Sequence, residues 1–113
     1  MITAKPLAKG LQTEFEFELP RGYVDEDGTM HRTVTMRLAR ASDEIQPLRD
    51  PRVQKNQSYL GVITLSRVIT RIGTLDAINT QVIENLFVED YGFCQQKYNE
   101  MNYPSSGATA SGE

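Results

Sequence analysis

The chain has 113 residues, about the size of one domain, and 39% of them are hydrophobic and 24% charged. This balance is typical of globular proteins and differs from the composition of disordered chains, which contain few apolar residues. The formal net charge of -3 favours neither nucleic acid nor anionic membranes, and one cysteine with one histidine provides no internal disulfide and no zinc ligand set.

The two ends of the chain differ from its middle. Residues 1–12 mix proline, glycine and lysines without periodicity, and residues 103–113 are mostly small and polar. We expect a flexible arm over 1–12, a single domain over 13–102 and a disordered tail over 103–113. The arm lacks the apolar run of a signal peptide, and no segment approaches the ~20 apolar residues of a membrane span. The sequence therefore predicts a cytoplasmic protein that does not bind membranes.

Two segments alternate between polar and apolar residues with the period of a β-strand. The first covers residues 14–19 and ends at Pro20, and the second covers residues 33–38. Asp27 and Gly28 between them mark a turn, so the pattern predicts a β-hairpin with a long loop. An isolated hairpin is marginally stable in water, so its apolar face must rest on helices. The inward positions are Phe15, Phe17, Leu19, Val34, Met36 and Leu38.

Helix signals follow the second strand. Ser42, with Asp43 and Glu44 after it, predicts the start of a short helix that Pro47 limits to about one turn. The pair Asp50-Pro51 offers another start, since a capping residue precedes a proline at the first helical position.

Two longer helices complete the predicted domain. One covers residues 57–72, with Gly73 as its C-terminal stop, and the other covers residues 80–102, with Asn79 as its cap. The predicted fold class is α+β, with an N-terminal β-hairpin packed on two long helices and a short helix between.

The first long helix places its charges away from its core. At 100° per residue its apolar residues form one stripe, and Arg67 and Arg71 lie on the opposite side. The two arginines are either solvated residues or the edge of a docking surface.

The last helix has a wide apolar band, about half of its circumference, that includes Leu86, Phe87, Tyr91 and Tyr98. A hairpin and one helix cover only part of such a band, so some of it can remain exposed to a partner. The alternative is that the short helix and the N-terminal arm cover the rest. Asp90 lies near the middle of the band. It is either a structural residue paired with an arginine or a polar residue that sets the specificity of an interface.

The sequence contains no candidate active site and no candidate cofactor or metal site. His31 begins a predicted strand, where we expect a partly exposed side chain, and Cys94 is expected to be a small core residue. The acidic run that ends at Gly28 lacks the ligand spacing of a calcium loop, so we interpret it as a solvated turn. We therefore expect a protein that is not an enzyme.

A helix–turn–helix interpretation is an alternative. The stretch RIGTLDAINTQVIENL places a short glycine-containing turn between two predicted helices. The second of these carries Glu84, Glu89 and Asp90 and no basic residue before Lys97, which argues against contact with DNA. A small DNA-binding regulator is thus the less favoured hypothesis.

The order of segments resembles the phage tail assembly chaperone family, including members encoded with phage-tail-like contractile particles. The likeness covers about residues 15–102, through FELPRGYVDEDGTMHRTVTMRLARASDEI, PLRDPRV and YLGVITLSRVITRIGTLDAINTQVIENLFVEDYGF. The family often has a proline directly after the cap of the last helix, where this chain has Thr80.

The resemblance implies a nonstructural helper that binds the tape-measure protein and promotes addition of tail-tube subunits in the cytoplasm of a bacterial host. The implied partners are the tape-measure protein, the tail-tube protein and a second copy of the chain, without nucleic acid. Arg67 and Arg71 would make charge contacts with one of them. The residues expected to bind a partner are Arg67, Arg71, Leu86, Phe87, Asp90, Tyr91 and Tyr98. A permanent tail or baseplate adaptor is the alternative.

Overall fold

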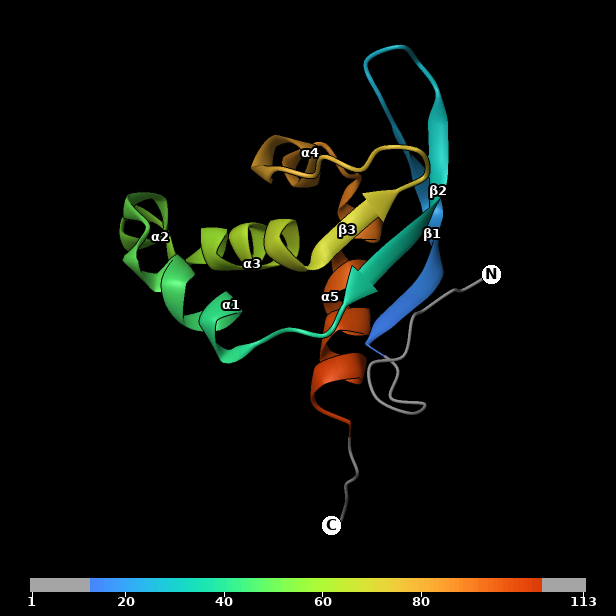
Figure 1. The fold of residues 1–113 in the computed structure, drawn as a ribbon. Helices are drawn as coiled ribbons and strands as arrows, with labels where there is room; N and C mark the ends of the chain where they lie inside the picture. Colours follow the sequence, from blue (N-terminus) through green and yellow to red (C-terminus); the bar gives the residue numbers. More distant parts are fainter. Residues whose placement is uncertain (1–12, 105–113) are drawn as a thin grey trace.

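The chain forms an α+β domain in which one antiparallel sheet packs against helices (Figure 1). The computed structural model describes residues 13–104, so the predictions for residues 1–12 and 105–113 lie outside the described residues. The strands are β1 (Glu14–Val24), β2 (Met30–Arg37) and β3 (Ile69–Ile72). The α-helices are α1 (Ala41–Ile45), α2 (Pro51–Lys55), α3 (Leu60–Val68), α4 (Thr80–Glu84) and α5 (Val88–Asn102), with 3-10 turns η1 (Gln46–Arg49) and η2 (Gln57–Tyr59). The predicted fold class is confirmed.

The hairpin supplies one wall of the core. Leu19 on β1 and Val34 and Met36 on β2 are fully buried, as their alternation with polar residues predicted. Phe17 meets Phe93 of α5 edge to face, with ring centroids 5.6 Å apart. Other core residues come from α3, β3, α4, α5 and the segment between α4 and α5, and they include Leu65, Val68, Ile69, Ile72, Ile83, Leu86, Cys94 and Tyr98.

Pro20 does not end the first strand, so that prediction was wrong. β1 continues to Val24, and its register with β2 shifts between Glu18 and Tyr23. β1 is an edge strand of the sheet, where a proline removes no essential ladder hydrogen bond. The N–H groups of Arg21 and Gly22 in this irregular stretch donate to Asp90 of α5.

The prediction of one helix over residues 57–72 was also wrong. α3 ends at Val68, and the next four residues form β3, which pairs antiparallel with β2. A register shift in this pairing places both Ile69 and Ile72 in the core, although they are three residues apart. Gly73 therefore follows a strand, where it has a φ of 61°.

The last predicted helix is interrupted. Asn79 caps α4 by accepting a hydrogen bond from the N–H of Val82, as expected, but α4 ends at Glu84. Phe87 has extended backbone and precedes α5, which is 15 residues long. The short helix near Ser42 begins at Ala41, so Ser42 is not its cap; the carboxylate of Asp43 accepts instead from the N–H of Arg40. Asp50 caps α2 as predicted.

Candidate functional site

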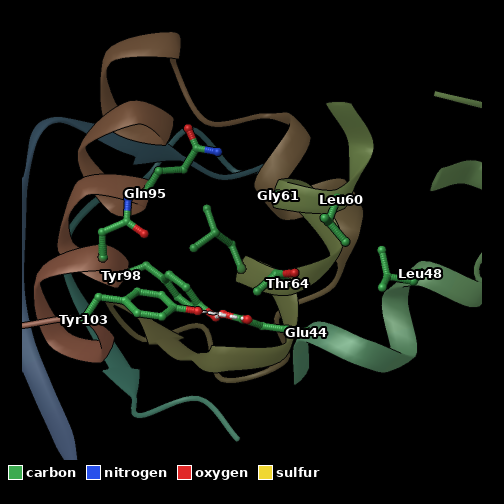
Figure 2. Close-up of a pocket in the computed structure, with 10 residues that line it drawn as sticks. Glu44, Leu48, Leu60, Gly61, Thr64, Gln95, Tyr98 and Tyr103 are labelled. Carbon is green, nitrogen blue, oxygen red and sulfur yellow. Dashed lines mark hydrogen bonds between the residues drawn. The ribbon is translucent and has the colours of Figure 1, made fainter. Parts of the chain in front are cut away.

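A hollow on the described surface lies where α1 and η1, α3 and α5 come together (Figure 2). It has a volume of about 620 Å³ and is open to solvent on one side. We call it the central hollow, and it is lined by Glu44, Leu48, Leu60, Gly61, Thr64, Leu65, Gln95, Tyr98, Asn99 and Tyr103. Its wall combines leucines, tyrosine rings and amide side chains, with one carboxylate, so it can bind an apolar segment and orient it through a few polar contacts.

Glu44 holds two tyrosines together at one side of the central hollow (Figure 2). Its carboxylate accepts hydrogen bonds from the hydroxyl of Tyr98 and from the hydroxyl of Tyr103, the latter at 2.7 and 2.9 Å. The bonds from Tyr98 and then Tyr103 lower the pKa of Glu44, while burial and the nearby carboxylate raise the pKa of Tyr98. The pair of rings is therefore fixed before any partner arrives, which reduces the entropy lost on binding.

The rim of the central hollow exposes apolar side chains. Leu48 is 53% exposed and Tyr103 is 59% exposed, and Leu60 is half-buried. The floor is made by Leu65 and Thr64, both buried. Exposed apolar groups beside a hollow favour contact with a partner, because covering them removes apolar surface from water.

Gly61 allows α3 and α5 to approach closely beside the central hollow. A Cβ atom at this position would lie 2.6 Å from the hydroxyl oxygen of Tyr91 and 2.7 Å from Nε2 of Gln95. The Gln95 amide also donates to the Tyr91 hydroxyl at 3.3 Å. These contacts separate the central hollow from a second hollow of about 420 Å³ on the other side of α3, which includes Leu86 and Tyr91.

The structure distributes the predicted partner residues over several surfaces. Tyr98 lines the central hollow but is 8% exposed, and Leu86 is 7% exposed. Tyr91 is half-buried, and Phe87, which is 52% exposed, faces a third hollow near the β1–β2 turn. The interruption between α4 and α5 is the reason that Leu86 and Phe87 do not continue the face of α5.

Asp90 is fully buried and has a structural role in the described chain. Its two carboxylate oxygens accept from the N–H groups of Arg21 at 2.8 Å and Gly22 at 2.9 Å. Asp90 therefore joins the first turn of α5 to β1, and it is not presented on the surface of this structure.

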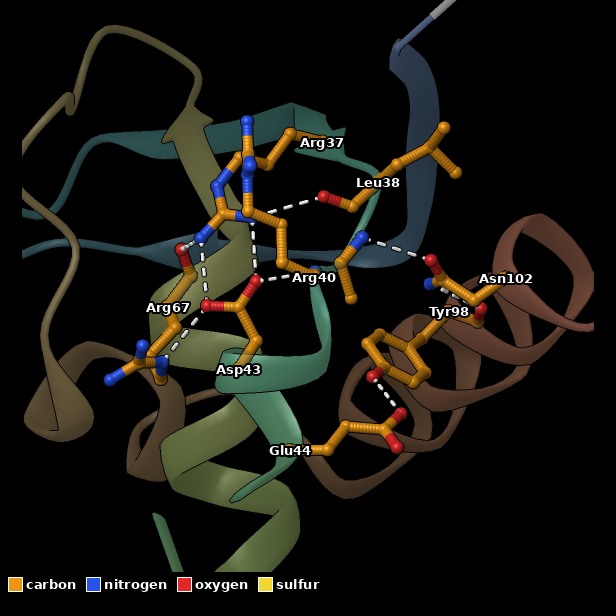
Figure 3. A network of polar contacts seen from close by, with 9 residues as sticks. Arg37, Leu38, Arg40, Asp43, Glu44, Arg67, Tyr98 and Asn102 are labelled. Carbon is orange, nitrogen blue, oxygen red and sulfur yellow. Dashed lines mark hydrogen bonds and ion pairs between the residues drawn. The ribbon is translucent and has the colours of Figure 1, made fainter. Parts of the chain in front are cut away.

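Arg67 and Arg71 differ in their surroundings. Figure 3 shows Arg67 beside Asp43, whose Oδ1 accepts from Nε of Arg67 at 3.0 Å. Arg37 donates to both carboxylate oxygens of Asp43, at 2.8 and 3.0 Å, and to the backbone carbonyl of Arg67. The hydrogen bonds that Asp43 accepts, above all those from Arg37, lower the pKa of Asp43 strongly. Arg71 lies on β3 and is exposed, and it donates to the carbonyl of Gly73 at 3.5 Å.

Sequence reasoning missed the importance of Asp43, Glu44 and Tyr103. The first two were interpreted only as acids in the first turn of a short helix, and Tyr103 was assigned to the tail. The signal that could have found them is the position of an acidic pair beside a short helix in a chain rich in tyrosine and arginine. Arg37 is only six residues from Asp43, but the contacts with Arg67, Tyr98 and Tyr103 span 24 to 59 residues of the chain. Spacing within the sequence does not reveal such distant contacts.

His31 is 7% exposed, so the expectation of a partly exposed residue was wrong. Its Nε2 lies 2.8 Å from Oδ2 of Asp25, and its ring stacks near that of Tyr23. Asp25 also accepts from the N–H groups of Asp27 and Thr29 within the turn, and the bond to His31 is the main cause of its lowered pKa. Cys94 is fully buried, as predicted, and burial raises its pKa to about 12.

Residues 13–104 contain neither a metal-binding cluster nor a helix that could span a membrane. No group of three or more histidine, cysteine, aspartate or glutamate residues in this range is arranged to hold a metal ion. Within the same range, each helix is too short or too polar to cross a bilayer.

Comparison with known proteins gave no match. The chain matches no protein family model, no curated protein and no solved structure.

Proposed function

We propose that this protein is a tail assembly chaperone, which binds the tape-measure protein of a phage or phage-like contractile particle and assists assembly of the tail tube. The observation that carries the proposal is the central hollow, with its apolar rim and its two tyrosines fixed by Glu44. The resemblance of residues 15–102 to that family supports the choice of partner. On this proposal the protein acts by binding, in the cytoplasm of the bacterial host, and not by catalysis.

The central hollow suits an apolar helical segment of the tape-measure protein. Leucine side chains of the segment would pack on Leu60 and on the rings of Tyr98 and Tyr103, while Gln95 and Asn99 contact its polar groups. Burial of two such side chains contributes about 3–6 kcal/mol before the cost of association is subtracted. Binding should therefore be reversible, as a helper that leaves during tube assembly requires.

Co-expression with the tape-measure protein tests the proposal. The wild-type chain should keep the tape-measure protein soluble and should elute with it, and Leu60→Glu should abolish both effects because it places a charge against the apolar segment. Tyr103→Ala should weaken capture about tenfold, whereas Tyr103→Phe keeps the ring and should weaken capture less.

Val88→Glu is the matched control, because Val88 is 87% exposed and lies outside the central hollow. A tape-measure protein that is equally soluble and forms tails equally well without this chain would contradict the chaperone proposal. Recovery of the protein from purified mature particles at a fixed stoichiometry would favour a permanent structural component instead.

A further inference from the structure

Two separate surfaces of the molecule have exposed apolar residues and opposite charges. The first, which we call the α1 ridge, consists of Ile45, Leu48 and Arg49. The second, which we call the turn hollow, has a volume of about 390 Å³ and lies between the β1–β2 turn and the α4 region. It is lined by Tyr23, Val24, Asp25, Glu26, Asn79, Gln81, Val82, Asn85 and Phe87.

The α1 ridge is an exposed surface with two apolar residues and one basic residue. Ile45 is 52% exposed and Leu48 is 53% exposed, and they are followed by the exposed Arg49. Ile45 is the last residue of α1, and Leu48 and Arg49 end the 3-10 turn η1 that follows it. Arg49 makes no ion pair with another residue of the range 13–104, so its charge is available to a partner.

The turn hollow is concave, apolar and acidic. Val24 is 43% exposed and Phe87 is 52% exposed at its edges, although both are large apolar residues. Asp25 and Glu26 contribute two carboxylates, and the lining contains no lysine or arginine. Asp25 is already bonded to His31 and the turn, which leaves the exposed Glu26 to meet a cation.

The ridge and the hollow of one molecule cannot meet each other. Figure 1 shows α1 far from the β1–β2 turn, with the body of the domain between them. We propose that the α1 ridge of one copy docks in the turn hollow of a second copy, with Arg49 of the first facing Glu26 of the second. The contact joins two different surfaces, so each copy retains a free ridge or hollow for a further copy and the association runs head to tail.

Charge exchange between the two positions tests this contact. Sedimentation velocity over a range of protein concentrations should show the average mass of the wild-type chain rising with concentration, and less so at high salt. Arg49→Glu and Glu26→Lys should each weaken association about tenfold, because each replaces an attraction by a repulsion. The double variant Arg49→Glu/Glu26→Lys should regain association, since its exchanged charges again attract.

An equimolar mixture of the two single variants should also associate, although each variant alone associates about tenfold more weakly than the wild type. In every contact between unlike copies of that mixture, either the introduced glutamate faces the introduced lysine or the unchanged Arg49 faces the unchanged Glu26. Lys55→Glu is the control, because it reverses an exposed lysine on α2 that belongs to neither surface. Thermal melting of each variant, followed by circular dichroism, establishes that the domain remains folded.

Three outcomes would overturn the proposal. A mass that stays at 12.7 kDa at every concentration would mean that no second copy occupies the turn hollow, which would leave it to a basic segment of another protein. Association that is unchanged by both single variants would assign self-association to another face. Failure of the folded double variant and of the mixture to regain association would exclude the pairing of Arg49 with Glu26. The measurement contains no tape-measure protein, so its result is independent of the proposed function.

Discussion

Asp90 accepts a hydrogen bond at 2.9 Å from the N–H of Gly22, 68 residues earlier in the chain, and both residues are buried. The second carboxylate oxygen accepts from the N–H of Arg21, while the side chain of Arg21 pairs with Glu89 at the surface. One aspartate thus satisfies two backbone donors that the shift in register between β1 and β2 leaves unpaired. The irregular stretch of an edge strand and the first turn of α5 are stabilised as one unit.

Asp90→Ala should therefore destabilise the domain by about 3 kcal/mol, because it leaves the buried N–H of Gly22 and the partly buried N–H of Arg21 without acceptors. Glu89→Ala, which removes only the exposed pair with Arg21, should change the free energy of unfolding by less than about 0.5 kcal/mol. Urea unfolding of the two variants provides the measurement. Equal effects of the two substitutions would show that Asp90 does not anchor β1.

Arg67 and Arg71 should respond differently to substitution. Arg67→Ala removes a donor to the buried Asp43 and should destabilise the domain by about 1–2 kcal/mol. Arg71→Ala should have an effect within about 0.5 kcal/mol, because its side chain is exposed. Denaturant titrations of the matched pair measure the difference, and an equally small effect at both positions would contradict the role of Arg67 in the Asp43 network.

Local signals in the sequence predicted local structure well. Asp50 and Asn79 cap the helices that were expected to begin beside them, because a capping side chain bonds to N–H groups only two or three residues ahead. The alternation in β2 likewise placed Val34 and Met36 in the core. These predictions require only the geometry of a short segment.

Other features depend on long-range contacts, which the sequence pattern does not predict. Ile69 and Ile72 have the spacing of a helical stripe, and only the shift in register between β2 and β3 lets a strand bury both. Periodicity alone could not distinguish the two structures. The candidate site could not be predicted for a similar reason. Glu44 and Tyr103 are 59 residues apart in the sequence, and no local pattern indicates their contact.

The pH dependence of stability should depend on Asp43. Its folded pKa is lowered, above all by Arg37, so it contributes stability above the ordinary aspartate pKa of about 3.9. That contribution is lost as the pH falls below about 4 toward the lowered pKa, because the folded state must then lose a charge that Arg37 and Arg67 stabilise. The free energy of unfolding, measured by urea titration at several pH values between 7 and 2.5, should decrease as the pH falls below about 4.

Asp43→Asn is the matched variant for this pH dependence. It should be less stable than the wild type at pH 7 and should show a smaller loss between pH 4 and pH 2.5, since its side chain does not titrate. Parallel pH curves for the two proteins would mean that other carboxylates, such as Asp25 beside His31, dominate the acid sensitivity.

Gly73 and Gly28 offer a comparison between backbone strain alone and strain combined with crowding. Both have positive φ, at 61° and 84°, so alanine at either position adopts a conformation that costs about 1–2 kcal/mol. A Cβ atom at Gly28 would meet nothing within 4 Å, whereas one at Gly73 would collide with the ring and Cβ of His31. Gly73→Ala must also displace a buried side chain, which adds about 1–3 kcal/mol.

We therefore expect Gly73→Ala to be clearly less stable than Gly28→Ala in denaturant titrations. The displaced His31 should also lose its bond to Asp25, so the histidine resonances of Gly73→Ala should shift in NMR spectra while those of Gly28→Ala remain near the wild-type positions. Similar stabilities with unchanged histidine resonances in both variants would contradict the tight packing of His31 on the turn after β3. The loop between β3 and α4 would then be free to move away from the hairpin without cost.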